Sequence, residues 1–358
     1  MIRIQNVYYM LAYAFKVLSE QGYKKIATEN FKNTADLMSA ILIKGIGVQV
    51  KRGLKKDYVP KNDSLSVLRG KISVSESIKA QTLTRRQLVC YYDDFSVDFY
   101  MNRIIKSTVL LLLHSDISKE RKKALRKLMV FFGEVEPIDL CTINWQINYN
   151  RNNQTYRMLI SICYLVVKGL LQTQTNGKMK LMDFIDEQNM HRLYEKFILE
   201  YYRQEFPQLN ANPSQIVWQL DDDVRDMLPV MQTDIMLSYE EKTLIIDAKY
   251  YSHTMQRQYD VHTLHSGNLY QIFTYVKNKE LELANTPHKV AGMLLYAKTD
   301  EEITPNREYS MSGNKIVVQT LDLEGNFSQI QEQLDKIAAT FFPKAINIKP
   351  KYKENMSN

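Results

Sequence analysis

The sequence has few cysteines. The 358-residue chain contains only Cys90, Cys141 and Cys163, which are scattered and form no C-x-x-C pair. An odd number of widely spaced cysteines argues against a disulfide framework and against a zinc ribbon, and it fits a reducing cytoplasm. Because 45% of the residues are hydrophobic, we expect the fold to be held by its core.

Targeting and membrane-spanning segments are also lacking. Arg3, Gln5 and Asn6 precede an aromatic run, and no small-residue cleavage site follows, so the N-terminus does not resemble a signal peptide. The most apolar stretch, Val109 to Leu113, is far too short to cross a bilayer. We therefore expect a soluble, cytoplasmic protein with no membrane partner.

Acidic residues do not balance the basic ones. The net charge is +7, the sequence pI is about 9.0, and the basic residues gather in short clusters. Such clusters attract polyanions, although each is equally compatible with a solvated charged face. The clusters are Lys51-Arg52, Lys55-Lys56, Arg85-Arg86 and the segment Lys119 to Lys127.

The length suits one large domain or two ordinary ones. A polar stretch with a turn signal, Gln172 to Gly177, suggests a boundary. We predict an α/β protein, α+β overall, with a mixed helical and β-rich N-terminal domain over residues 1–174. An α/β domain over residues 175–358 follows it.

Local patterns predict the elements within these domains. Asn6 is a typical helix cap, so a helix is expected from about Val7 to Gln21, and a second from Thr34 to Gly45. Residues 46–100 alternate and are punctuated by Gly and Pro, which predicts mostly β structure. Further helices are expected at 100–114, 119–131, 156–171, 187–206, 266–277 and 327–341. Strands are expected at 216–219, 232–237, 243–250, 290–296 and 315–322.

Two acids and a lysine stand out in the second domain. Strand side chains alternate between faces, so Asp247 and Lys249 share one face of the strand Thr243 to Tyr250. If the strand 232–237 pairs antiparallel with it through a turn at Glu240-Glu241, the two numbers of each facing pair add to 481. Asp234 then lies across from Asp247.

This pairing predicts a metal site. Two adjacent carboxylates repel each other unless a cation neutralises them, and Mg²⁺ prefers one or two carboxylates together with waters and phosphate oxygens. We expect one or two Mg²⁺ ions held by Asp234, Asp247 and the Ala248 carbonyl. Lys249 would position the attacking water or stabilise negative charge at phosphorus. Asp-x-Lys alone is a weak pattern, because many strands end in charged residues.

Three further residues are candidates for supporting roles. Glu195 lies on the preceding helix and can be a third acid, an outer partner of the site or a plain surface residue. Gln271 and Tyr275 are four apart and share a helical face. Gln271 can order a water or contact DNA, and the alternative is the polar edge of a packed helix.

Taken together, Glu195, Asp234, Asp247-Ala248-Lys249 and Gln271-x-x-x-Tyr275 resemble the PD-(D/E)xK nuclease core. More closely, the chain resembles the McrC family, the nuclease subunits of McrBC modification-dependent restriction systems. The resemblance extends over nearly the whole length. It rests on the segments Asn6 to Ala14, Asn102 to Thr108, Met231 to Ile235, Ile246 to Tyr251 and Asn268 to Gln271.

The resemblance implies a restriction-endonuclease-like domain at 175–358 that cuts methylcytosine-containing double-stranded DNA with Mg²⁺, using Asp234, Asp247 and Lys249. It also implies a partner, a GTP-hydrolysing AAA+ ring of the McrB type, which residues 1–174 would contact and stimulate. The sequence contains no G-x-x-x-x-G-K-[ST] motif, so we expect no GTP to be bound by this chain.

Residues for contact with the partner cannot be carried over by motif. The stretch 48–76, with Arg52, Arg69 and Lys71, is our hypothesis for the ring-facing element. Two other functions stay open at this stage. One is a stand-alone repair nuclease of the RecB-like group, and the other is a non-catalytic activator of an AAA+ motor.

Overall fold

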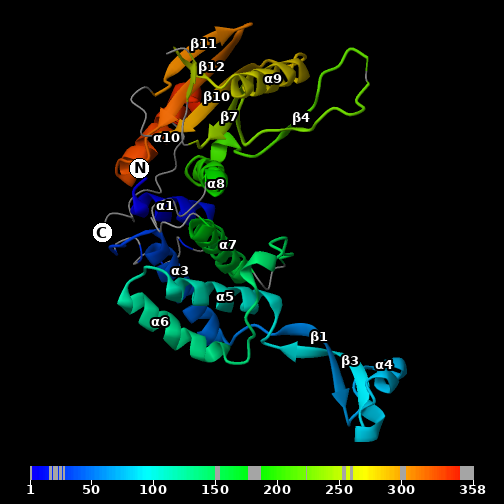
Figure 1. Ribbon diagram of the computed structural model, residues 1–358. Helices are drawn as coiled ribbons and strands as arrows, with labels where there is room; N and C mark the ends of the chain where they lie inside the picture. Colours follow the sequence, from blue (N-terminus) through cyan, green and yellow to red (C-terminus); the bar gives the residue numbers. More distant parts are fainter. Residues whose placement is uncertain are drawn as a thin grey trace. The chain divides into compact units, whose positions relative to one another are not determined.

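The fold is described by a computed structural model, shown in Figure 1. Its described residues are 2–15, 18, 23, 26, 29–149, 154–175, 187–222, 224–251, 255–258, 261–298 and 304–346. They form two compact units. We call Met1–Ala27 with Asp186–Asn358 the sheet unit, and Thr28–Ile185 the inserted unit.

This division differs from the predicted domains of 1–174 and 175–358. The first 27 residues pack with the C-terminal half of the chain, and the second unit boundary lies at Ile185 and Asp186. The predicted boundary falls instead at the end of a long helix, α7 (Gln154–Thr175). A polar turn signal is local, whereas a unit boundary depends on long-range packing, so the sequence did not locate it.

A five-stranded mixed sheet forms the centre of the sheet unit. Its order is β11-β12-β10-β7-β6. The three central strands run parallel, and the two edge strands pair antiparallel with their neighbours. The strands are β6 (Ile235–Tyr239), β7 (Lys242–Lys249), β10 (Lys289–Ala297), β11 (Arg307–Met311) and β12 (Asn314–Leu321). Two small antiparallel pairs accompany it, β4 (Gln215–Ile216) with β5 (Met231–Gln232) and β8 (Met255–Gln258) with β9 (Val261–Leu264).

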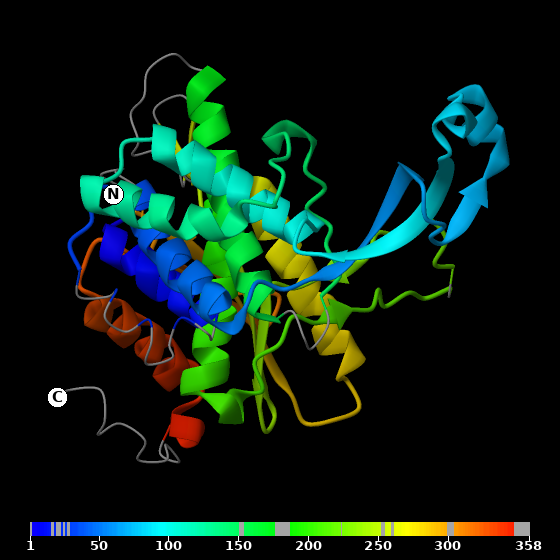
Figure 2. The same ribbon diagram turned by 90° about the horizontal axis from the view of Figure 1, so that it is seen from below.

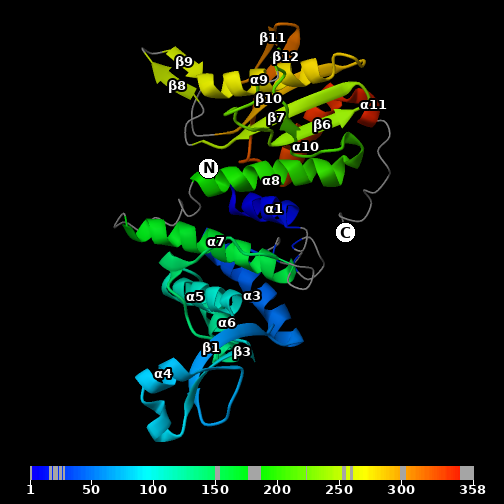
Figure 3. The ribbon, with the colours of Figure 1, turned by 90° about the vertical axis from the view of Figure 1, so that its right-hand side faces the viewer.

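Helices cover both faces of this sheet. Figures 1 and 3 show α9 (Ser266–Glu282) on one face, and α8 (Glu187–Glu205) and α10 (Phe327–Phe341) on the other. α9 packs closely on the sheet at Gly292 of β10, where there is no room for a larger side chain. A Cβ placed on Gly292 would come within 2.8 Å of Ile272 and Val276 side-chain atoms. The sheet unit also contains η8 (Pro207–Leu209) and α11 (Pro343–Ile346).

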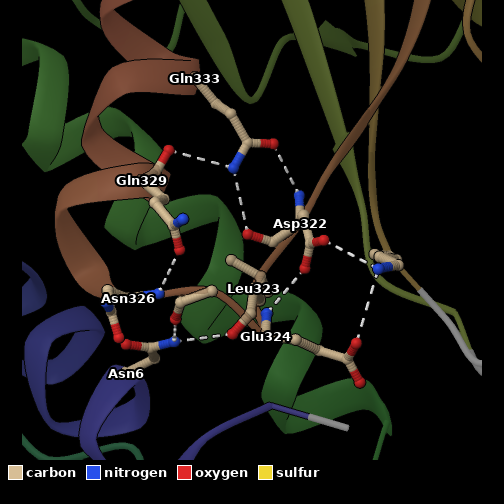
Figure 4. Close-up of polar contacts among 9 residues, drawn as sticks. Asn6, Asp322, Leu323, Glu324, Asn326, Gln329 and Gln333 are labelled. Carbon is tan, nitrogen blue, oxygen red and sulfur yellow. Dashed lines mark hydrogen bonds and ion pairs between the residues drawn. The ribbon is translucent and has the colours of Figure 1, made fainter.

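The N-terminal helix α1 (Ile4–Ala14) completes the sheet unit. The predicted cap role of Asn6 is wrong: Asn6 lies inside the helix and is 2% exposed. Its amide donates to the main-chain oxygens of Leu323 (2.7 Å, Figure 4) and Gly325 (2.9 Å), just before α10. The Tyr9 ring stacks on Phe327 with centroids 4.4 Å apart. Long-range partners, which no local pattern encodes, therefore decide where this helix begins.

The inserted unit is built on a set of helices with an antiparallel ribbon. The helices are α3 (Thr34–Arg52), α5 (Tyr100–His114), α6 (Lys119–Met129) and α7, with short η4 (Val130–Phe132) and η5 (Leu140–Thr142). The ribbon consists of β1 (Asp57–Leu65), β2 (Lys71–Ser73) and β3 (Leu88–Ser96), with α4 (Val74–Lys79) and η3 (Thr82–Arg85) near its far end.

We call residues 57–96 the arm, because the ribbon projects away from the helices of its own unit (Figures 1 and 2). Asn102 of α5 holds its root. The fully buried Asn102 amide donates to the main-chain oxygens of Lys55 (3.1 Å), just before β1, and of Val97 (2.8 Å), just after β3. A single side chain thus ties both ends of the arm together.

The expectation of β structure after residue 45 is wrong over 46–52. α3 runs on to Arg52 and ends at Gly53, whose φ of 82° terminates the helix. Leu42, Ile46 and Gln49 are buried at helical spacing, so packing overrides the β propensity of the Val and Ile residues in this segment. The α/β class itself is confirmed. Among the described residues, no helix is both long and apolar enough to cross a bilayer.

Candidate active site

The β6–β7 hairpin brings the two predicted acids together. Ile235 pairs with Ile246 and Tyr239 with Lys242, which is the predicted register, and the two-residue turn lies at Glu240-Glu241. Glu240 takes the left-handed conformation that such a tight turn requires, with φ of 50°. Asp234 directly precedes β6 and Asp247 directly follows Ile246, so the two acids lie just beyond the last pair of this ladder.

Asp234 is held against β7 by the main chain. Its Oδ2 accepts a hydrogen bond of 2.9 Å from the Ala248 N–H. Burial, followed by the negative charges of Asp247 and Glu195, raises the pKa of Asp234 to about 7. A carboxyl group with this pKa is ready to lose its proton to a bound cation near neutral pH.

Asp247 and Lys249 form a buried ion pair on one face of β7. The Lys249 Nζ lies 2.9 Å from Asp247 Oδ1, and the two residues are 8% and 2% exposed. The other oxygen, Asp247 Oδ2, is buried and has no hydrogen-bond partner among the described residues. Burial raises the pKa of Asp247 despite the opposing attraction of Lys249. Burial lowers the pKa of Lys249, but the Asp247 carboxylate outweighs it, so the net pKa is raised and the lysine stays charged.

A chain of hydrogen bonds on α9 positions Lys249. Lys249 Nζ donates to Gln271 Oε1 (3.3 Å), and Gln271 Nε2 donates to the Tyr275 hydroxyl (3.0 Å). The Tyr275 hydroxyl in turn donates to the Gln232 main-chain oxygen (3.1 Å). The predicted shared face of Gln271 and Tyr275 is confirmed. This chain connects the lysine to the segment that precedes Asp234.

Glu195 of α8 lies near Asp234. Its side-chain partner, His191, was not predicted from the sequence. His191 Nδ1 lies 2.7 Å from Glu195 Oε1. The hydrogen bond to Glu195 raises the pKa of His191 despite partial burial, and the charges of Lys249 and Asp234 also act on it. The spacing of four between His191 and Glu195 was the available signal. A third carboxylate and an imidazole thus border the acid–lysine group.

These residues suit Mg²⁺. Asp247 Oδ2 is buried without a hydrogen-bond partner and Asp234 lies beside it, so the two carboxylates fit the oxygen ligands that Mg²⁺ prefers. Within the described parts of the chain, no three acidic, His or Cys side chains are grouped as a metal cage. Asp234 and Asp247 stay the predicted carboxylate ligands. The Ala248 carbonyl stays a predicted third ligand, and the structure shows only its N–H contact to Asp234.

The three residues proposed for partner contact lie in the inserted unit, but not on one element. Arg52 is exposed in the last turn of α3, outside the predicted β-rich stretch. Arg69 and Lys71 belong to the arm. The Arg69 guanidinium lies 3.1 Å from Asp94 and 4.2 Å from the centre of the Tyr92 ring, and Lys71 is exposed at the start of β2.

A family model described as "McrBC 5-methylcytosine restriction system component" matches residues 4–297. The chain belongs to the McrBC family. The match begins in α1 and ends in β10, so it includes every candidate residue named above. A curated relative from Escherichia coli strain K12 supports it, the "Type IV methyl-directed restriction enzyme EcoKMcrBC". It is 30% identical over 343 residues, which cover 93% of this chain and 96% of the relative.

Two solved structures from Thermococcus gammatolerans are similar at lower levels. A half-complex of McrB AAA+ hexamers with bound McrC is 18% identical, has a TM-score of 0.46 and covers 92% of this McrBC-family chain and 76% of its own. A McrBC complex is 21% identical, has a TM-score of 0.40 and covers 56% and 58%. With TM-scores below 0.5, these likenesses give no residue-level correspondence.

Proposed function

We propose that this chain is the Mg²⁺-dependent endonuclease subunit of a GTP-driven McrBC-type complex that cuts methylcytosine-containing DNA. The observation that supports this most strongly is the hairpin that sets Asp234 beside Asp247 with Lys249 on the same face. The methyl-directed restriction activity named for the E. coli relative supports the DNA substrate.

Each residue has a distinct part in hydrolysis of a phosphodiester. Asp234 and Asp247 would hold the cation, which when bound would polarise the scissile phosphate and lower the pKa of a bound water. Lys249 offers a fixed positive charge to the phosphate oxygens as negative charge grows on them. Gln271 and Tyr275 keep the Lys249 ammonium in place. Glu195, supported by His191, adds negative charge next to Asp234.

The partner in this proposal is an AAA+ GTPase ring of the McrB type, which this chain stimulates without binding GTP itself. Its class follows from the resemblance of the sequence and from membership of the family. Arg52, Arg69 and Lys71 remain our proposed contacts to the ring.

A cleavage assay on methylated and unmethylated DNA tests the proposal. It is run with Mg²⁺ or EDTA, with and without the partner and GTP. We expect Asp247→Asn to reduce cleavage by at least about 100-fold, because loss of a metal ligand removes several kcal/mol of transition-state stabilisation. Glu241→Gln is the matched control, since this exposed acid lies at the turn of the same hairpin, and it should cleave normally.

The other outcomes separate the alternatives. Cleavage by the isolated chain without partner and GTP would favour a stand-alone repair nuclease. GTPase stimulation by a chain that never cleaves would favour a non-catalytic activator. Cleavage that survives Asp247→Asn would rule out the proposed site.

A further inference from the structure

α6 carries an unusual density of positive charge in the inserted unit. Six of its eleven residues are basic, against a single acid, Glu120. The basic residues are Lys119, Arg121, Lys122, Lys123, Arg126 and Lys127. Leu125 is its only fully buried residue, so most of this charge faces outward.

Four of these residues form one continuous stripe. Lys119, Lys123, Arg126 and Lys127 are exposed, and their spacings of four, three and one place them on the same side of a helix of 3.6 residues per turn. The stripe, defined by these four residues, is about 12 Å long at 1.5 Å per residue. Within the described parts of the chain, none of the four makes an ion pair or side-chain hydrogen bond.

Three acids close to α6 in the inserted unit are already engaged. Glu29 pairs with Arg121, whose guanidinium also faces the Phe31 ring. Asp116 pairs with Lys32 at 2.6 Å, and Asp36 Oδ1 accepts the Ser118 N–H at 3.0 Å. Arg121 therefore serves the fold, whereas Glu120, the one acid of α6, forms no ion pair with the stripe among the described residues.

An uncompensated stripe is costly for a helix. Lys119 with Lys123 and Lys123 with Lys127 are like charges four residues apart, and each such pair destabilises a helix by about 0.2–0.5 kcal/mol. Lys119 also opposes the dipole at the helix N-terminus. The like-charge pairs oppose helix stability, whereas Arg126 and Lys127 in the last turn favour it through the helix dipole, so the fold alone gives no reason for the full stripe.

We propose that the stripe of α6 binds the phosphate backbone of duplex DNA, as a contact separate from the acid–lysine site. The inference rests on the proposed function, which makes DNA the substrate. Duplex DNA carries one negative charge per about 1.7 Å of axis, so a row of four cations about 12 Å long can meet several phosphates. The contact is to backbone, so it contributes affinity without reading sequence.

The test is equilibrium binding of a short fluorescein-labelled duplex to the full chain in EDTA, followed by anisotropy over a range of KCl concentrations. The stripe variant replaces Lys119, Lys123, Arg126 and Lys127 with Gln. We expect affinity at about 0.1 M salt to fall by about 10-fold or more, and the slope of log K against log salt to become shallower by about 3. Gln has nearly the helix propensity of Lys, so the thermal midpoint should not fall.

The control removes the same charge from exposed positions of the inserted unit outside the basic clusters, by changing Lys44, Lys79, Arg157 and Lys168 to Gln. It should bind within about 2-fold of wild type. Equal weakening of both variants would overturn the proposal, since net charge alone would then explain binding. Wild-type affinity in the stripe variant would overturn it too, and would leave an acidic protein surface as the ligand of α6. Cleavage by Asp247→Asn tests the acid–lysine site and not the stripe. DNA binding by the stripe can therefore be rejected while the proposed function stands.

Discussion

The carboxylate of Asp247 is almost completely buried. One oxygen meets Lys249 at 2.9 Å, and the other has no partner among the described residues. Asp234 lies beside it with its pKa raised to about 7. Two buried acids of this kind weaken the fold when both are ionised. In the proposed Mg²⁺ site, a bound divalent cation would offset this loss of stability.

The raised pKa of Asp234 predicts that the stability of the fold depends on pH. The folded-state pKa of Asp234 lies above the ordinary value of 3.8, so the folded chain keeps a proton that the unfolded chain releases. Stability from this group is present at low pH and is lost as the pH rises from about 4 to about 7. Thermal unfolding across this range should show the loss, with each 1 kcal/mol worth about 2–4 °C.

Mg²⁺ should reverse the loss above pH 7, because it binds the ionised pair. Asp234→Asn should flatten the pH dependence and abolish the stabilisation by Mg²⁺. Asp226→Asn, the same change at an exposed residue of the same unit, should alter neither. A Mg²⁺ response that persists in Asp234→Asn would contradict the assignment of this ligand.

At the level of single residues, the sequence located the acid–lysine group because strand alternation and a two-residue turn fix the register of a hairpin. Gln271 and Tyr275 followed from helical spacing in the same way. The Gln232 carbonyl that receives Tyr275 could not be found, since main-chain atoms carry no sequence signal. His191 was overlooked because its partner Glu195 was itself only a candidate.

At the level of secondary-structure elements, the position of the arm depends on the contacts at its root. Asn102 fastens the ends of β1 and β3, and Arg69 is braced by Asp94 and Tyr92. Arg52 has no part in this ribbon, because it lies on α3. Two of the proposed contacts to the GTPase ring, Arg69 and Lys71, therefore lie in the arm, and the third, Arg52, lies on α3.

This division can be tested by GTPase stimulation. If the arm faces the ring, Arg69→Ala with Lys71→Ala should lower stimulation by about 10-fold or more, which corresponds to about 1.4 kcal/mol of binding. Arg52→Ala should then have a smaller effect. Lys79→Ala is the control, as it removes an exposed charge near the far end of the arm. Unchanged stimulation after replacing Arg52, Arg69 and Lys71 together would reject all three contacts.

Element prediction succeeded where burial and local pattern agree. The helices at 100–114 and 327–341 have the predicted bounds, because their apolar residues recur at helical spacing. β11 was missed, since four of its five residues are exposed and so carry no core signal. The end of α3 was misread because β-branched residues there pack as a helix.

At the scale of the whole molecule, the sheet unit is discontinuous in sequence. Met1–Ala27 belongs with Asp186–Asn358, and the inserted unit lies between them. The Asn6 amide fixes α1 to the main chain before α10 (Figure 4). The N-terminal segment is therefore part of the proposed nuclease unit.

Asn6→Ala should consequently destabilise the sheet unit. It leaves the buried Leu323 oxygen without the Asn6 amide, and loss of a buried hydrogen bond costs about 1–3 kcal/mol. Hydrogen exchange should quicken in α10 and β12 but not in α5 or α7. Gln5→Ala removes an exposed amide from the same helix and should leave exchange unchanged. Faster exchange confined to the inserted unit would contradict this arrangement.

The link between Asn6 and Leu323 also constrains how the chain folds as it is synthesised. These residues are 317 positions apart, so α1 leaves the ribosome long before Leu323 has been synthesised. During the first part of that interval Tyr8, Met10 and Leu11, all buried in the finished protein, have no α8 to pack against. The inserted unit can fold in the meantime, since domains generally fold as units. Chaperone binding to the nascent N-terminus should therefore last until α10 has emerged.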